Sequence, residues 1–128
     1  MTMTGLLVIL GAAVGAPLRY LVDRAVQARH DSVFPWGTLT VNLVGCLALG
    51  VLAGAGTAAP GGVVALLGIG LCGSLTTFST FSYETVRLAE DGAWFYCAAN
   101  VVISVVVGLG AALLGFALAT ALLAQVTR

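Results

Sequence analysis

Residues 73–84, with the sequence GSLTTFSTFSYE, carry the side chains best suited to binding a ligand, namely closely spaced hydroxyls and aromatic rings. They continue a long apolar stretch, and no Asp, Glu, Lys, Arg or His occurs between Trp36 and Tyr83. In the hydrocarbon core of a membrane each hydroxyl needs a hydrogen-bond partner, so such a cluster has to face protein, water or an ion. The run therefore predicts a polar pathway through a membrane.

Side chains on neighbouring turns and segments are candidates for the same pathway. Phe78 and Phe81 are three residues apart and share a helix face, so their positive ring edges can replace part of an anion's hydration shell. Core packing or lipid contact is the alternative for this pair. Asn42 can donate N–H to an anion, and Ser104 shares a helix face with Asn100. Bonds between helices are the alternative for these polar residues, and for Asn100 the better interpretation.

Two charged residues lie near the ends of the apolar segments. Arg19, if it points inward, makes an electropositive vestibule that favours anions; the alternative is a side chain that reaches the interface beside Tyr20. Glu84 lies one turn past Phe81, either at a pore mouth or in interfacial water. Both residues are therefore candidates for the ends of a pathway.

Residues 73–77, GSLTT, combine glycine with hydroxyl side chains that weaken a helix. A broken membrane helix frees backbone carbonyls, which can coordinate a cation such as Na⁺. The alternative is a continuous helix whose hydroxyls bond to carbonyls one turn earlier. The run thus predicts either a break with a cation site or an ordinary helix.

The composition points to a small integral membrane protein. Of 128 residues, 60% are hydrophobic and only 8% are charged, against about 25% charged residues in soluble domains. Five Arg balance five acidic residues, so nucleic acid is not an expected partner. The sequence 68–73, GIGLCG, matches a dinucleotide-binding pattern, but it lies inside an apolar span. Since metal-binding and nucleophile motifs are also lacking, we expect no enzyme activity.

The apolar residues fall into four segments, about 4–23, 36–56, 63–88 and 94–124, each long enough to span a bilayer as a helix. The prediction is one all-α membrane domain, 1–128, with four transmembrane helices. Two pairs of glycines four residues apart, Gly11 with Gly15 and Gly50 with Gly54, predict close helix packing, although glycine is frequent in membrane helices generally. Four short helices bury little surface, so we expect an oligomer.

Three motifs in order resemble the Fluc/CrcB family of fluoride channels, and the resemblance extends over nearly the whole chain. They are residues 11–20 (GxxxGAxxRY), 37–45 (GTxxVNxxG) and 73–84 (GxLTTFSTFSxE), of which the third is highly specific. Residues 100–104 resemble a weaker fourth motif. The resemblance implies an antiparallel, dual-topology dimer in the cell (plasma or inner) membrane, with a third helix broken near its middle and two fluoride pores.

The resemblance also implies roles for single residues. Fluoride would leave the cell passively past an amide donor, two ring edges and a track of hydroxyls. A structural Na⁺ at the dimer centre would bind the carbonyls of Gly73 and Thr76. The expected fluoride pathway comprises Asn42, Phe78, Phe81, Ser104, Thr77 and Thr80, with Arg19 at the vestibule and Glu84 at a mouth.

Two other functions fit the composition. A small multidrug or guanidinium exchanger is also a four-span dimer, but it needs an intramembrane carboxylate to exchange for protons, and Asp23 and Glu84 lie near span ends. A non-transporting membrane assembly subunit would use polar residues only to join helices. A slight excess of Arg on the links, Arg24, Arg29 and Arg87, makes a heterodimer with an oppositely oriented homologue the alternative to a homodimer.

Overall fold

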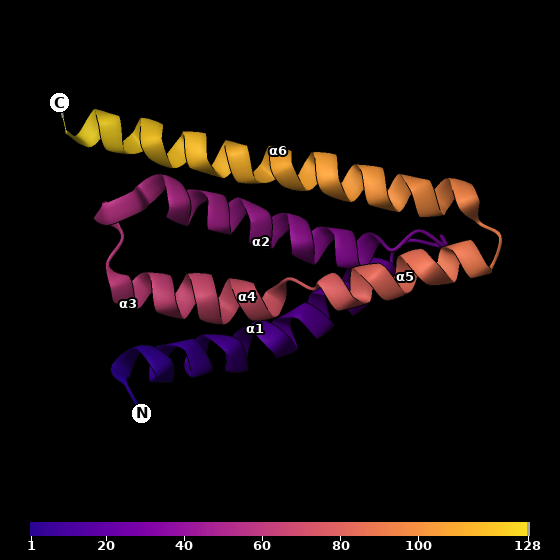
Figure 1. Cartoon of the computed structure of the whole chain (residues 1–128), viewed down its shortest axis with the longest axis horizontal. Helices are drawn as coiled ribbons and strands as arrows, with labels where there is room; N and C mark the ends of the chain where they lie inside the picture. The colour runs from indigo at the N-terminus through magenta and orange to yellow at the C-terminus, as the bar shows by residue number, and fades with distance from the viewer. Residues whose placement is uncertain (128) are drawn as a thin grey trace.

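The computed structural model describes residues 1–127 and contains, within them, four helical segments long and apolar enough to cross a membrane. They are α1 (Met3–Gln27), α2 (Trp36–Ala55) with the 3-10 turn η1 (Gly56–Ala58), a third segment (Gly61–Glu90), and α6 (Trp94–Val126). The predicted all-α architecture with four spanning helices is confirmed. Figure 1 shows an elongated bundle in which α2 runs beside α6 and both termini lie at the same end.

The side chain of Gln27 connects several points of the link between α1 and α2. The Gln27 amide donates to the carbonyls of Ser32 at 3.2 Å and Phe34 at 3.3 Å. Its Oε1 accepts from the Gly37 N–H at 3.3 Å. A Cβ on Gly37 would lie 2.9 Å from the Cα of Asp23, so the start of α2 lies directly against α1. These contacts set the start of α2, and with it the position of the polar residues further along that helix.

Close helix packing at the two predicted glycine pairs is confirmed. A Cβ on Gly11 would overlap the backbone of Leu66 and Gly70 in the third segment, and Gly15 lies against the next turn of the same segment. Gly50 and Gly54 lie against the backbone of α6 in the same way. Because glycine lets backbones approach this closely, α1 packs on the third segment and α2 on α6.

The third segment changes conformation along its length. It begins with α3 (Gly61–Val63), a π-helical stretch η2 (Val64–Cys72) and α4 (Gly73–Leu75). Thr76 (φ −73°, ψ 151°) and Thr77 (φ −146°, ψ 117°) then have extended backbones, and helix resumes as α5 (Phe78–Glu90). Figure 1 shows this extended stretch between α4 and α5. The Thr77 hydroxyl accepts from the Thr80 N–H at 3.2 Å and so caps α5.

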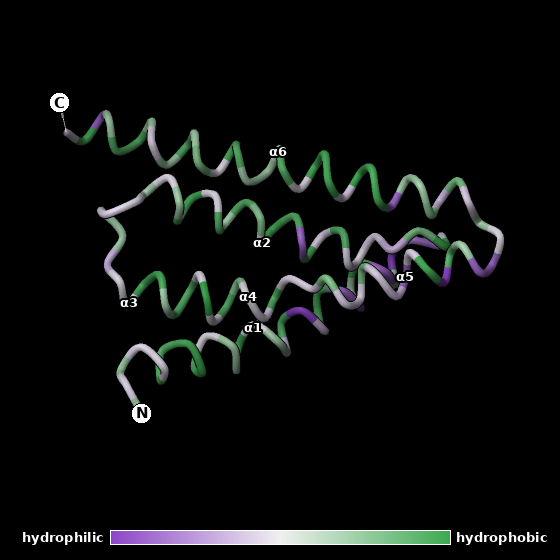
Figure 2. Tube along the Cα trace, viewed as in Figure 1, coloured by the Kyte–Doolittle hydropathy of each residue, from purple (hydrophilic) through white to green (hydrophobic). Residues whose placement is uncertain are grey.

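Hydrophobic side chains cover most of the outer surface. Figure 2 shows hydrophobic residues along most of α2 and α6, and a concentration of hydrophilic residues near α5. On α6, large apolar side chains such as Val106 (62% exposed) and Leu113 (66% exposed) point away from the bundle. Such a surface suits contact with lipid or with another membrane helix. Candidate ligand-binding sites therefore lie among the polar side chains inside the bundle.

Candidate functional site

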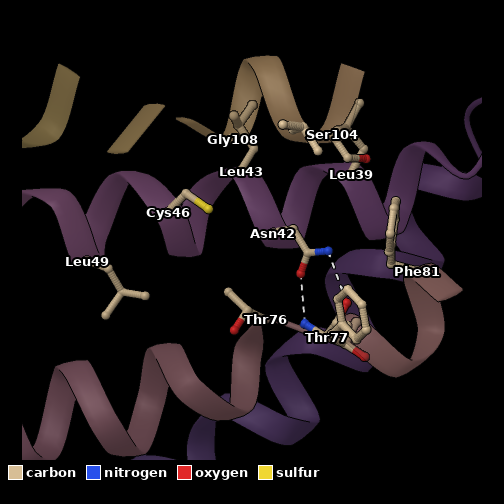
Figure 3. A pocket seen from close by; sticks show the side chains of 12 residues that line it. Leu39, Asn42, Leu43, Cys46, Leu49, Thr76, Thr77, Phe81, Ser104 and Gly108 are labelled. Atoms are coloured by element: carbon tan, nitrogen blue, oxygen red, sulfur yellow. Dashed lines mark hydrogen bonds between the residues drawn. The ribbon is translucent and has the colours of Figure 1, made fainter. Parts of the chain in front are cut away.

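A groove of about 340 Å³ brings together five of the eight residues predicted for the pathway. Asn42 comes from α2, Thr77 from the extended stretch, Phe78 and Phe81 from α5, and Ser104 from α6 (Figure 3). The lining residues within the described chain carry no charge. Those residues are Leu39, Asn42, Leu43, Cys46, Leu49, Thr76, Thr77, Phe78, Phe81, Ser104, Val105 and Gly108.

Asn42 is bound to the main chain of Thr77 by two hydrogen bonds (Figure 3). The Thr77 N–H donates to Asn42 Oδ1 at 2.7 Å, and Asn42 Nδ2 donates to the Thr77 carbonyl at 3.1 Å. In an uninterrupted helix the Thr77 N–H would donate to the Gly73 carbonyl, four residues earlier. Asn42 therefore stabilises the extended stretch in addition to lining the groove. Its second Nδ2 proton, which bonds to no other residue of the described chain, is the one available to a ligand.

Phe78 and Phe81 lie next to each other on α5. Their ring centroids are 5.8 Å apart, with an angle of 40° between the ring planes. Phe78 is 79% exposed, whereas Phe81 is partly buried. Aromatic rings have positive edges, so the pair can contact an anion in the groove without a full charge. The exposed Phe78 leaves one side of this groove to be covered by lipid or by another subunit.

A second, smaller cavity of about 190 Å³ shares Thr77 with the groove. The Thr77 hydroxyl donates to the Thr80 hydroxyl at 3.0 Å, so these two predicted track residues contact each other. Arg19, on α1, is one of the residues that line this cavity. The lining residues are Arg19, Tyr20, Asp23, Thr38, Val41, Thr77 and Thr80.

Glu84 lies at a third and larger cavity of about 480 Å³. The Thr38 hydroxyl donates to Glu84 Oε1 at 3.0 Å, while the buried Glu84 Oε2 has no hydrogen-bond partner in the described chain. Asp23 lines both this cavity and the second one, so the three cavities follow one another through shared residues. In contrast to the groove, the third cavity is lined by charges: Asp23, Arg24, Glu84, Arg87 and Asp91.

Gly73 is the first residue of α4, and Thr76 directly follows the last residue of that helix. Gly73 is exposed on the single chain, and the Thr77 N–H bonds to Asn42 instead of to the Gly73 carbonyl. Carbonyl oxygens are hard ligands of the kind that alkali and alkaline-earth cations prefer. Two carbonyls from one chain make only part of a coordination sphere. Carbonyls of this kind suit a cation such as sodium, and the rest of its coordination sphere would have to come from other ligands.

Three functional candidates were missed by the sequence analysis. Thr38 lies one turn before Asn42 on α2, and Thr85 lies one turn after Phe81 on α5, so helical spacing from the predicted residues was a usable signal for both. Asp23 was treated only as a carboxylate at a span boundary. Its contact with the start of α2 depends on how the link folds, which spacing does not indicate.

Comparison with known proteins identifies the family. Residues 6–116 match the family described as "CrcB-like protein, Camphor Resistance (CrcB)". The chain belongs to the CrcB family. It is 63% identical over 123 residues to "Fluoride-specific ion channel FluC 1" of Streptomyces avermitilis, with 94% of this chain and 98% of that protein covered. The resemblance seen in the sequence motifs is thereby confirmed.

Other CrcB relatives are also named as fluoride channels. "Fluoride-specific ion channel FluC 1" of Frankia casuarinae is 64% identical over 126 residues, covering 93% of this chain and 98% of the relative. "Fluoride-specific ion channel FluC 2" of Mycobacterium tuberculosis is 51% identical over 108 residues, with 84% of both chains covered. These CrcB relatives are ion channels and not enzymes, in agreement with the prediction that this chain is not an enzyme.

Proposed function

We propose that this protein is a fluoride-selective ion channel that exports fluoride from the cell passively, down its electrochemical gradient. The observation that carries the proposal is the uncharged groove of Asn42, Phe78, Phe81 and Ser104 within a membrane-length helix bundle. Membership of the CrcB family, and relatives that are named fluoride-specific ion channels, support fluoride as the ion.

The groove suits a small, strongly hydrated anion. Fluoride has to exchange water for other donors, and conduction requires binding that is strong enough for entry and weak enough for exit. The free Nδ2 proton of Asn42, the Ser104 hydroxyl and two ring edges are weak donors without a full positive charge. From the groove the ion would pass the hydroxyls of Thr77 and Thr80 to the vestibule.

The ends of the proposed pathway carry charge. Arg19, in the wall of the second cavity, would draw the anion toward the hydroxyls of Thr77 and Thr80. Glu84, hydrogen-bonded to Thr38, would stand at the mouth and face the charged third cavity. Fixed charges thus lie outside the narrow groove, so that inside it the ion meets only weak donors and is not trapped.

The functional unit in this proposal is an antiparallel, dual-topology dimer with two pores. The 79% exposure of Phe78 supports a partner that completes the groove. A third helix broken near its middle in each subunit would present the carbonyls of Gly73 and Thr76 at the dimer centre. A structural Na⁺ bound there would supply charge that joins the two subunits. The partner is a second copy, or alternatively an oppositely oriented homologue, within the plasma or inner membrane.

One observation favours a second candidate, a cation–proton exchanger. The partly buried Glu84 has an unpartnered oxygen, and an intramembrane carboxylate is the group such an exchanger requires. Glu84 lies in the last part of the third segment, at a cavity with three carboxylates and two Arg side chains, whereas the groove lining of the described chain includes no carboxylate. The channel therefore remains the function that the geometry supports best.

Fluoride efflux from liposomes tests the proposal. Purified protein is reconstituted into liposomes loaded with potassium fluoride, efflux is started with valinomycin, and external fluoride is read with an electrode. Liposomes loaded with potassium chloride are the matched control. Rapid fluoride efflux without chloride efflux is the expected result. Monodisperse protein that passes neither ion would contradict the proposal and favour a non-transporting assembly subunit.

A further inference from the structure

A chain of three hydrogen bonds connects two groove residues through the interior of the protein. The Ser104 hydroxyl donates to Asn100 Oδ1 at 3.5 Å, and Asn100 Nδ2 donates to the Thr85 hydroxyl at 2.9 Å. The Thr85 hydroxyl in turn donates to the Phe81 carbonyl at 2.7 Å. The chain begins on α6 and ends on α5, and both of its end residues line the groove.

The direction of these bonds is fixed by the Phe81 carbonyl. A carbonyl accepts only, so the single hydrogen of the Thr85 hydroxyl is used on it and Thr85 has to accept from Asn100. The Asn100 amide nitrogen therefore faces Thr85, and its oxygen faces Ser104. Of the three bonds the one from Ser104 is the longest, at 3.5 Å, the outer limit of a hydrogen bond. The Ser104 hydrogen is the weakly held end of the chain.

We propose that Asn100 and Thr85 are positioning residues of the anion pathway. They orient the Ser104 hydroxyl relative to the Phe81 ring across α5 and α6 through a bond of 3.5 Å, which is weak enough for the Ser104 hydrogen to leave it for an anion in the groove. The inference rests on the proposed channel function. Neither residue is in the groove lining of the described chain, and Asn100 is only 1% exposed, so both act through their neighbours.

A purely structural role explains less of the arrangement. Asn100 as a simple bond between helices would need only its contact with Thr85. Such a role would not require the hydrogen bonds to extend on both sides to Ser104 and Phe81, which line the same groove. Because interior bonds of this kind polarise one another, a change at Thr85 should be felt at Ser104.

The test compares three single substitutions in the liposome fluoride assay. Thr85→Val keeps the shape of the side chain but removes the hydroxyl, and we expect fluoride efflux about tenfold slower, since a buried donor on Asn100 loses its acceptor. Thr85→Ser keeps the hydroxyl and should stay within about twofold of wild type. Thr120→Val is the matched control, because the Thr120 hydroxyl bonds only to carbonyls of its own helix on an exposed face.

A double substitution separates positioning from general destabilisation. If Thr85 acts through Ser104, adding Thr85→Val to Ser104→Ala should slow efflux by less than about threefold further. If the double variant instead slows efflux by the product of the two single effects, the inference is overturned. Should Thr85→Val be recovered only as aggregate, Asn100→Ser tests the same chain, because its shorter side chain cannot reach both partners. Aggregation of both variants would show that these three hydrogen bonds serve only to stabilise the fold, and would overturn the inference.

The wild-type measurement distinguishes this inference from the proposed function. Wild-type protein without fluoride efflux overturns the channel proposal and the positioning role together. Wild-type efflux that Thr85→Val leaves unchanged overturns only the positioning role. Wild-type efflux with loss in Thr85→Val, rescue in Thr85→Ser and no change in Thr120→Val supports both.

Discussion

The two halves of the third segment lie end to end but contact different parts of the protein. Residues 61–75 are apolar and pack against α1 through glycine contacts at Gly11 and Gly15. The half formed by α5, Phe78–Glu90, contacts α6 and carries hydroxyl, aromatic and charged side chains that line all three cavities. The first half anchors the segment, and the second presents polar groups. Substitutions in the first half should therefore reduce the amount of folded protein, whereas substitutions in the second half should reduce conduction.

The largest expected effect is a loss of folded protein when the glycine contact of the first half is filled. In Gly11→Ala the new Cβ would lie 2.8 Å from the Leu71 nitrogen and 2.9 Å from the Gly70 Cα. Backbone atoms cannot move aside as a flexible side chain does, so we expect the free energy of unfolding to fall by about 3 kcal/mol or more. Size-exclusion chromatography and thermal unfolding measure it.

Gly5→Ala is the control for this prediction on the same helix. Its nearest contact, Thr2 Oγ1 at 3.4 Å, is an ordinary one, so stability should not fall. Equal stability of Gly11→Ala and wild type would contradict the anchoring role of the first half.

The next largest effect is expected at Asn42, where a folded protein should lose conduction. Asn42→Asp keeps the acceptor for the Thr77 N–H but replaces the amide donor with a negative charge. Two like charges about 4 Å apart repel by about 4 kcal/mol at an effective dielectric constant of about 20, which corresponds to about a thousandfold slower fluoride efflux. Liposome efflux measures it.

Gln125→Glu makes the matched amide-to-acid change on the exposed end of α6 and should conduct as wild type does. Conduction by Asn42→Asp at the wild-type rate would place the ion elsewhere.

A smaller effect is expected at the aromatic pair. Phe81→Ile keeps an apolar side chain and removes the ring edge from the groove. Aromatic contacts contribute about 0.5–1.5 kcal/mol, so fluoride efflux should slow by about twofold to about tenfold while the protein stays folded. Phe95→Ile, at a ring that is 78% exposed and outside the groove, is the control. Equal slowing in both variants would show that ring contacts in the groove have no special role.

The smallest effect is expected at Glu84, and it separates a channel from an exchanger. Glu84→Gln keeps an oxygen that can accept from the Thr38 hydroxyl and removes the charge at the mouth. In a channel, fluoride efflux should change by less than about threefold, because Glu84 lies outside the groove lining and the neutral amide still accepts from Thr38. An exchanger would lose transport completely, since its proton carrier is gone. Glu90→Gln, at the exposed end of α5, is the control, and both variants are assayed for fluoride efflux.

The sequence could predict the elements and much of the groove, for identifiable physical reasons. A span without charges makes every hydroxyl in residues 73–84 conspicuous, and glycines four apart indicate where backbones meet. Helical spacing places Phe78 and Phe81 on one face, as the structure has them. Local spacing alone is enough for such inferences.

Contacts between distant elements could not be predicted in the same way. Helical periodicity gives the face on which a side chain lies but not the partner that this face meets. The Thr38–Glu84 and Asn100–Thr85 bonds depend on how α2, α5 and α6 are rotated against one another. Asn42 was expected to donate to an anion, and its bonds to the Thr77 backbone exist only because the chain is extended there.

The central claim is selective, passive conduction of fluoride through the uncharged groove. The most direct test is the reversal potential of the current in a planar bilayer that holds the purified protein between opposed fluoride and chloride gradients. A current that reverses at the equilibrium potential of fluoride is the predicted result. A current that reverses at the chloride potential, or the absence of current from protein that is folded and inserted, would contradict the account.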